Sequence, residues 1–382
     1  LGGWVIACDL PSGTEAGSGL VSHAVIQADE TVSFAAAKTG IISWPGRGFA
    51  GEISVADLGL PRGFAGQAVR SAGYRPVMGL GREDIIAWRP ERTGDANKGD
   101  FGKALIRAGS PGMAGAAVLA ARACSGSGAG LTRVLVDDSL VPGLLDVVPS
   151  SLIHALQKEP EAALRQWQEA LGWASAVLIG PGLGQPAEAD TDTVRLKLAL
   201  QQAKRLVLDA DALNQLAAWG SEGRELLRAR TTAGLEPAAL TPHPGEFSRL
   251  CPEAYGAGRP AAEPEGGRID AARRYAGETD SVIVLKGAGT VIALPPACQG
   301  ETDIWINTSG NPGMAKGGSG DLLSGILVSL LAQGLPLDQA VGAGVWLHGH
   351  AADLAAEQCG ERALSAEAQL DGLPRALRQV GW

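Results

Sequence analysis

The chain has 382 residues, of which 45% are hydrophobic and 54 are glycine, scattered without the three-residue glycine period of collagen. This length and composition exclude a fibrous chain, a disordered chain and a disulfide miniprotein, and predict a globular protein of one large domain or two. The formal net charge of −9 argues against binding to nucleic acid or to an acidic membrane surface, and we predict neither kind of partner.

The five cysteines are far apart and never form a CxxC pair, which indicates free thiols in a reducing compartment. No apolar run approaches the roughly 18 to 20 residues that cross a bilayer. We therefore expect a soluble protein of the cytoplasm. The chain begins with Leu1 and runs almost at once into an apolar segment, so we expect that an upstream part precedes it.

The first part of the chain contains three short apolar runs. Residues 4–9 end in a carboxylate and a Pro-Ser-Gly turn, a pattern typical of the carboxyl end of a buried parallel strand. Further runs follow at 31–36 and 52–56, and a stretch rich in proline, glycine and charge then predicts a linker. We divide the chain into a first unit at 1–80, a linker at 81–97 and a second unit at 98–382.

In the second unit, short apolar runs alternate with longer stretches of helical pattern, which favours βαβ units and a sheet covered on both faces. Several runs end in Gly, Asp, Thr or Lys. Because ligands of open α/β sheets bind beyond the carboxyl ends of the strands, we expect the chemistry at these residues. The predicted strands are Ala104–Ala108, Ala176–Gly180, Leu206–Asp209, Ala239–Thr241, Val282–Lys286 and Thr290–Leu294.

Glycine-rich junctions accompany the first of these strands. Lys98–Gly102 precedes the first strand, and Ala108–Ala117 follows it as a glycine loop that leads into a helix. After the second strand, Gly180–Gly184 lacks the GxGxxG spacing of a Rossmann fold, although its three glycines permit a ligand to approach the backbone closely. A plain tight turn explains this loop equally well.

Polar residues follow the next strands. Asp209–Asn214 places two acids and an amide where a hydrated Mg²⁺ or a ribose hydroxyl could bind, or where the acids only cap the next helix. His243 lies between two prolines that fix a stiff turn, which suits ligand contact, whereas a turn histidine without a task is the alternative. Lys286–Thr290 joins two strands through a glycine turn, either as a simple hairpin or with a lysine that reaches a nucleotide.

The strongest motif is Gly317-Gly318-Ser319-Gly320-Asp321, followed by apolar residues on one face of a predicted amphipathic helix. Glycines let backbone N–H groups converge, and the helix dipole adds about half a positive charge, so phosphate or an oxyanion is favoured there. Asp321 would then take a proton from a hydroxyl. The alternative is a tight loop with Asp321 as a helix cap.

Other catalytic motifs give weaker signals. His348 and His350 are two residues apart, so they do not share a helix face, and this spacing argues against metal ligation. The sequence contains no P-loop, no GxSxG and no HExxH motif.

Taken in chain order, these motifs resemble the ADP/ATP-dependent NAD(P)H-hydrate dehydratase family over roughly residues 85–380. The resemblance implies an α/β fold, namely a ribokinase-like three-layer α/β/α sandwich. It also implies a lyase reaction in which (6S)-NAD(P)H hydrate is dehydrated while ADP or ATP is hydrolysed, with Mg²⁺ bridging the phosphates.

The resemblance also assigns residues. It implies that Asp321 deprotonates the ring hydroxyl, while Gly318, Ser319 and Gly320 steady the transferred phosphoryl group. The implied contacts of the hydrate are Ala116, Gly182, His243 and Asp321. The implied contacts of the nucleotide are Lys286, Gly287, Ala288, Gly289, Thr290 and Gly320.

Residues 1 to about 62 resemble the last third of the NAD(P)H-hydrate epimerase domain, a Rossmann-like α/β fold that bacteria often fuse to the dehydratase. That resemblance implies that Asp9 and Asp29 are substrate positions and that Thr31 belongs to an incomplete K⁺ site. The chain lacks the family's Asn-Gly-Gly-Asp-Gly type of loop, so we expect no epimerase activity. We expect NAD(P)H hydrate and ADP or ATP as partners, and a homo-oligomer.

Two other functions remain open. A small-molecule kinase of the ribokinase-like class would use the same glycine turn and Asp321. A non-catalytic nucleotide-binding protein would use the glycine loops for binding alone.

Overall fold

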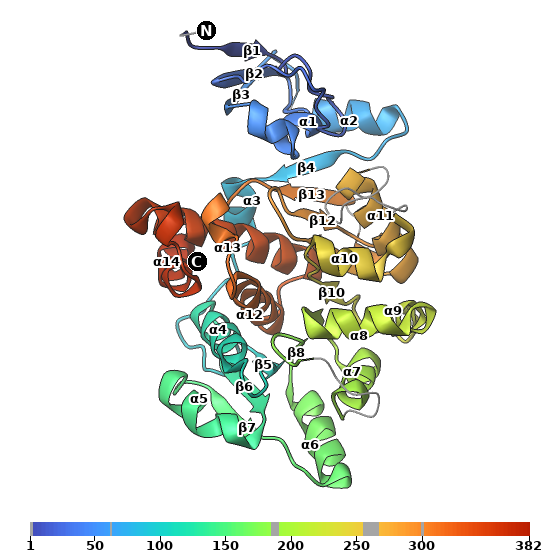
Figure 1. Cartoon of the computed structure of the whole chain (residues 1–382), viewed down its shortest axis with the longest axis vertical. Helices are drawn as coiled ribbons and strands as arrows, with labels where there is room; N and C mark the ends of the chain where they lie inside the picture. Colours follow the sequence, from blue (N-terminus) through green and yellow to red (C-terminus); the bar gives the residue numbers. More distant parts are fainter. Residues whose placement is uncertain (1–2, 62, 185–190, 255–266, 299–301) are drawn as a thin grey trace.

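The computed structural model of the chain describes residues 3–61, 63–184, 191–254, 267–298 and 302–382. Across these residues, ten strands form one large sheet and three strands form a small sheet close to the N-terminus (Figure 1). The small sheet is parallel and consists of β1 (Ile6–Cys8), β2 (Glu30–Phe34) and β3 (Glu52–Ala56).

The large sheet is parallel except at β12, which runs antiparallel to both of its neighbours. Its strands lie in the order β4 (Val77–Leu80), β13 (Ile304–Asn307), β12 (Val291–Ala293), β11 (Val282–Leu285), β10 (Ala239–Leu240), β9 (Leu206–Leu208), β8 (Ala176–Ile179), β5 (Lys103–Arg107), β6 (Leu131–Val136) and β7 (Leu152–Ala155). The six strands predicted for the second unit are therefore confirmed within one or two residues.

Helices cover both faces of this sheet, because successive residues of its buried strands point to opposite sides. In β11, Val282 and Val284 join one hydrophobic core, and Ile283 and Leu285 join the other. The first core is covered by α3 (Arg82–Ala87), α4 (Ala114–Gly126), α5 (Val141–Val147), α12 (Ser319–Ala332), α13 (Leu337–Cys359) and α14 (Ala366–Gln379). The second is covered by α6 (Pro160–Trp173), α7 (Thr191–Gln202), α8 (Asp211–Trp219), α9 (Ser221–Thr232), α10 (Pro244–Leu250) and α11 (Gly267–Thr279). The predicted three-layer α/β/α sandwich is confirmed.

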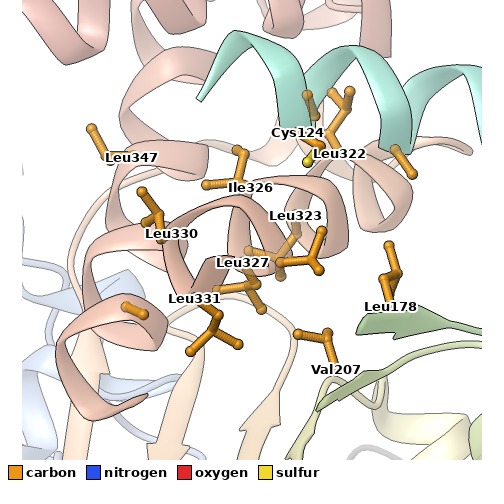
Figure 2. Close-up of a cluster of buried hydrophobic side chains, with 14 of the residues drawn as sticks. Cys124, Leu178, Val207, Leu322, Leu323, Ile326, Leu327, Leu330, Leu331 and Leu347 are labelled. Atoms are coloured by element: carbon orange, nitrogen blue, oxygen red, sulfur yellow. The ribbon is translucent and has the colours of Figure 1, made fainter. Parts of the chain in front are cut away.

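Helix α12 differs from the predicted amphipathic helix because it is buried on every side from Leu322 to Ala332. Figure 2 shows its leucines between α4, which carries Cys124, and the strands that carry Leu178 and Val207. The less apolar face of α12 carries small residues, which permit close packing against neighbouring elements. A Cβ added to Gly325 would lie 2.3 Å from the backbone oxygen of Ala120 in α4.

The predicted division of the chain differs from the structure at its boundary. Strand β4 lies inside the predicted first unit but pairs with β13 of the large sheet. Helix α3 lies inside the predicted linker, and its Ile85 is fully buried in the core. The remaining helices of the first unit are α1 (Thr39–Ile42) and α2 (Phe64–Ser71).

Two properties concern the chain as a whole. All five cysteines are free thiols, as predicted. Within the described ranges, no helix has both the length and the apolar character that a membrane span requires.

Candidate active site

The loops after β5, β8, β9, β10 and β11 leave the same edge of the large sheet, because these five strands are parallel neighbours. We call this region the strand-end site. The sequence predicted chemistry at this edge, and most of the predicted residues of the second unit belong to its loops.

The loops after β5 and β8 bring Ala116 and Gly182 together. Gly182 has φ +63°, and a Cβ added there would lie 2.8 Å from the Cβ of Ala116. The two loops are joined by a hydrogen bond of 2.8 Å from the Gly109 amide to the Pro181 carbonyl. Two of the four residues predicted to contact the hydrate are therefore neighbours, although 66 positions separate them in the sequence.

Gly180 allows the ends of β8 and β9 to approach closely. Its φ is +134°, and an added Cβ would lie 1.8 Å from the backbone oxygen of Asp209. A side chain would therefore separate the two strand ends. Close packing of the strand ends therefore explains a glycine at this position without any ligand.

Asp209 is buried and joins three elements at the strand-end site. Its Oδ1 accepts a hydrogen bond of 2.8 Å from Nζ of Lys286, and its Oδ2 accepts one of 2.5 Å from the Ser324 hydroxyl in α12. The next residue, Ala210, has φ +49°, a strained conformation for alanine. Asp211 accepts a hydrogen bond of 2.8 Å from the Gly184 amide. Both acids therefore organise the site, beyond the capping role left open by the sequence.

Lys286 lies among carboxylates. Its Nζ is 3.9 Å from Oε2 of Glu246, in addition to its contact with Asp209. Burial disfavours the ammonium, but the charges of Asp209, Glu246 and Asp321 raise the pKa of Lys286 above its ordinary value. Burial also raises the pKa of Glu246, and Lys286 partly offsets that effect. The lysine is therefore a fixed cation in a site with an excess of acids.

The glycine turn before α12 reaches this cluster. Gly318 has φ +90°, and a Cβ there would lie 2.6 Å from Cδ1 of Leu119. A Cβ on Gly320 would lie 3.3 Å from Nζ of Lys286 and 3.8 Å from Oδ2 of Asp209. The glycine turn therefore lies directly beside Lys286 and the buried Asp209.

Asp321 lies in the first turn of α12, whose N-cap is Gly318, so Asp321 is not the capping residue. Burial, together with the nearby charges of Asp209 and Asp211, raises the pKa of Asp321 to about 6, although Lys286 opposes this shift. A carboxyl group with a pKa near the working pH is suited to general base catalysis.

His243 is the N-cap of α10. Its Nδ1 accepts a hydrogen bond of 3.0 Å from the Gly245 amide, and Glu246 bonds back to the His243 amide at 2.7 Å. Burial, followed by the charges of Lys286 and Arg249, lowers the pKa of His243. The histidine thus has a structural task as a cap, and half of its side chain remains exposed beside the acid that faces Lys286.

Lys286–Thr290 is the turn between the antiparallel strands β11 and β12, so the hairpin interpretation holds. Arg268 of α11 fixes this turn by donating to the carbonyls of Leu285, Lys286 and Ala288 at 3.0, 3.2 and 2.8 Å. The sequence gave no signal for Arg268, because its partners lie about 20 positions away. Trp44 of the first unit also reaches this turn, with Cδ1 3.4 Å from the Cβ position of Gly289.

Several residues that the sequence analysis considered lie outside these loops. Lys98–Gly102 is at the amino end of β5, where a Cβ on Gly102 would lie 1.8 Å from the backbone oxygen of Ala332. His350 pairs with Gln379 at 2.7 Å, whereas His348 bonds to Ser319 at the start of α12.

The residues of the epimerase-like segment lie in and beside the small sheet. Asp9 forms an ion pair with Lys38. Asp29 accepts a hydrogen bond of 2.7 Å from the Val5 amide, and the Thr31 hydroxyl donates to the Ala50 carbonyl at 2.6 Å.

Comparison with known proteins identifies relatives of this chain. Residues 104–374 match the family described as NAD(P)H-hydrate dehydratase, and residues 2–40 match the YjeF-related protein N-terminus. The bifunctional NAD(P)H-hydrate repair enzyme Nnr of Moorella thermoacetica is 39% identical over 98% of this chain and 67% of its own length. The enzyme of the same name from Escherichia coli is 36% identical over 95% of this chain and 63% of its own length.

A solved structure supports the same assignment. The ADP/ATP-dependent NAD(P)H-hydrate dehydratase of Bacillus subtilis, co-crystallised with ATP/Mg²⁺, superposes with a TM-score of 0.63 and 30% identity. The superposition covers 80% of this chain and 99% of that protein. The chain therefore belongs to the family of NAD(P)H-hydrate dehydratases, lyases that repair damaged nicotinamide cofactors.

Proposed function

We propose that the strand-end site transfers a phosphoryl group from ADP or ATP to the ring hydroxyl of (6S)-NAD(P)H hydrate. Asp321 takes the hydroxyl proton, the oxygen bonds to the terminal phosphorus, and the bond from phosphorus to the nucleotide breaks. Water is a poor leaving group, and phosphate is a good one. The ring nitrogen lone pair then expels phosphate, and loss of a proton from the adjacent carbon restores the ring double bond.

The observation that carries this proposal is the surroundings of Asp321. Its carboxyl group has a pKa of about 6 and belongs to the same turn as Gly320, which lies beside Lys286 and Asp209. A base near neutrality, a cation and the backbone amides of a glycine turn suit an in-line phosphoryl transfer. Gly318, Ser319 and Gly320 then steady the phosphoryl group.

Ala116, Gly182 and His243 line the side that we assign to the hydrate. The contact between Ala116 and Gly182, and the exposed half of the His243 ring, support this assignment. We assign the nucleotide to Lys286 and the turn that follows it, Gly287, Ala288, Gly289 and Thr290, which Arg268 holds in place.

The oxygen donors at the site fit a magnesium ion that keeps most of its ligands on water and phosphate. Phosphate and water would supply most of its ligands, because the described residues contain no group of three or more His, Cys, Asp or Glu side chains that could hold a metal ion. When bound, Mg²⁺ neutralises charge on the phosphates. The Bacillus subtilis relative was co-crystallised with ATP/Mg²⁺, which supports the same co-substrate here.

The decisive experiment incubates NADH hydrate with the chain, Mg²⁺ and either ADP or ATP, and follows the return of the NADH absorbance. We expect NADH, phosphate and the shortened nucleotide in equal amounts. The Asp321→Ala variant should lose turnover and keep nucleotide binding. A stable phosphorylated product would support a kinase instead, and absence of turnover in the unaltered chain would support a non-catalytic binder.

For the first unit, we propose that Asp9 and Asp29 are substrate positions of an epimerase-like segment and that Thr31 is a K⁺ position. The match of residues 2–40 supports this assignment. Because the chain lacks the family's Asn-Gly-Gly-Asp-Gly type of loop, we expect no epimerisation of the R hydrate by this chain, with or without K⁺. Conversion of R to S hydrate would contradict this expectation. The homo-oligomeric state and the cytoplasmic location remain predictions.

A further inference from the structure

A buried polar group lies behind the first turn of α12, and two of its three residues have no part in the reaction as proposed. It consists of Ser319, His348 of α13 and Gln369 of α14, and we call it the Ser-His-Gln group. Nε2 of His348 is 2.8 Å from the Ser319 carbonyl and 3.2 Å from its hydroxyl. The Ser319 hydroxyl also donates to Gln369 at 3.2 Å, and Gln369 donates to the His348 carbonyl at 2.9 Å.

The surroundings of this group are apolar. His348 is 7% exposed and Gln369 2%, and both line a small cavity with Ala123, Leu322, Ile326, Ala351, Leu370 and Leu373. A polar group in such a place is costly unless its hydrogen bonds are made. Three polar side chains that bond to one another here therefore need a reason beyond core packing.

The direction of the key hydrogen bond follows from its acceptor. A backbone carbonyl only accepts, so Nε2 of His348 must carry the hydrogen. Burial lowers the pKa of His348 to about 4, so the ring is neutral at physiological pH. His348 is thus a fixed donor aimed at the residue between Gly318 and Gly320.

The position of that residue gives the bond its consequence. Ser319 opens α12 after Gly318, an N-cap without a side chain to hold the turn, and Asp321 follows two residues later. Glycine-rich backbone has more conformational freedom than any other. The glycine N-cap cannot hold this turn with a side chain, and the Ser-His-Gln group holds it instead through Ser319.

We propose that His348 is a positioning residue for phosphoryl transfer. Through the Ser319 carbonyl, and with Gln369, it holds the glycine turn so that the amides and Asp321 face Lys286. The inference rests on the proposed function of the strand-end site and adds a residue that touches neither the hydrate nor the nucleotide.

The test compares two substitutions of similar size. His348→Gln keeps a donor close to the place of Nε2, whereas His348→Leu removes it. We expect kcat of hydrate dehydration to fall roughly 10- to 100-fold in H348L, with a much smaller change in KM for the nucleotide. In H348Q, kcat should stay much closer to that of the unaltered chain.

Leu370→Ala is the matched control, because Leu370 lines the same cavity and makes none of these hydrogen bonds. It should lose thermal stability and keep kcat within about twofold of the unaltered chain, since it leaves the positioning bonds in place. Equal loss of kcat in H348L and L370A, or unchanged kcat in a folded H348L, would overturn the proposal.

A second variant covers the case in which H348L does not fold. Gln369→Leu removes the support from α14 and should lower kcat less than H348L does, again without a matching rise in KM; an unchanged kcat would count against the proposal. If the unaltered chain shows no dehydratase activity, the proposed function fails first, which keeps the two failures distinct.

Discussion

Asp321 has a carboxylate whose ionisation the folded protein disfavours. Its pKa is raised to about 6, above the unfolded value. Asp321 therefore does not lower the free energy of unfolding at low pH, where it is protonated in both states, and lowers it fully above pH about 6. Asp321→Asn should therefore stabilise the chain at pH 8, by on the order of 2 kcal/mol, and have no such effect near pH 4. Denaturant unfolding at both pH values measures this difference.

The same residue predicts the pH dependence of the reaction. Asp321 must be ionised to accept a proton, so turnover should decline as pH falls below about 6. The exposed Asp371 on α14 is the control, because Asp371→Asn should change neither the pH profile nor the stability difference. Equal stability of D321N and the unaltered chain at pH 8 would contradict the prediction.

Lys286 and Asp209 form an ion pair whose loss should be partly reversible by a second change. Lys286→Met leaves Asp209 and Glu246 buried without their cation, which should lower the free energy of unfolding by roughly 3–5 kcal/mol. The double variant Lys286→Met with Asp209→Asn should regain part of that loss and no activity. Urea unfolding of the single and double variants gives the coupling, and strictly additive losses would refute it.

From the sequence alone, roles could be proposed mainly for residues that are adjacent in it. Gly318, Gly320 and Asp321 form one motif, and strand-end chemistry pointed to Lys286. The role of Asp209 stayed open because its partner lies 77 positions away. Arg268 and the bond between His348 and Ser319 left no local pattern, since both depend on how separate helices meet the sheet.

At the scale of elements, the contact between α12 and α4 depends on Gly325. An added methyl would lie 2.3 Å from the Ala120 oxygen, so Gly325→Ala should push the helices apart and destabilise the chain by roughly 1–3 kcal/mol. Gly277→Ala, at an exposed position of α11 with open space around its Cβ, should stabilise it by up to about 1 kcal/mol. Thermal melts of both variants test this, and a stable G325A would contradict it.

Secondary-structure elements could be predicted where their own residues form a characteristic pattern. The strands with continuous apolar runs that end in Gly, Asp, Thr or Lys were found, because burial on both faces leaves that pattern. Strand β4 was not found, since it is four residues long, contains a glycine, and gains its partner β13 from more than 200 positions away. For α12, the sequence could not show that α4, α13 and the sheet surround it.

At the scale of the molecule, the second unit should need residues that precede the predicted boundary at 98. The Thr308 hydroxyl bonds to the Leu80 carbonyl at 2.5 Å, and the Trp382 indole bonds to the Ile85 carbonyl at 3.0 Å. A fragment of residues 76–382 should therefore fold and keep dehydratase activity. A fragment of residues 98–382 should melt lower, by roughly 2–4 °C for each kcal/mol lost. Equal melting temperatures would place the boundary at 98 after all.

Helix α12 carries the partly buried Asp321 in its first turn and is enclosed from Leu322 to Ala332. Backbone amides inside such a helix can exchange with deuterated water only when the whole domain opens. Slow exchange along α12, down to the rate of global unfolding, would follow directly from its enclosure. Heat or denaturant should then abolish catalysis and the native state in one cooperative transition, with no folded but inactive species between them.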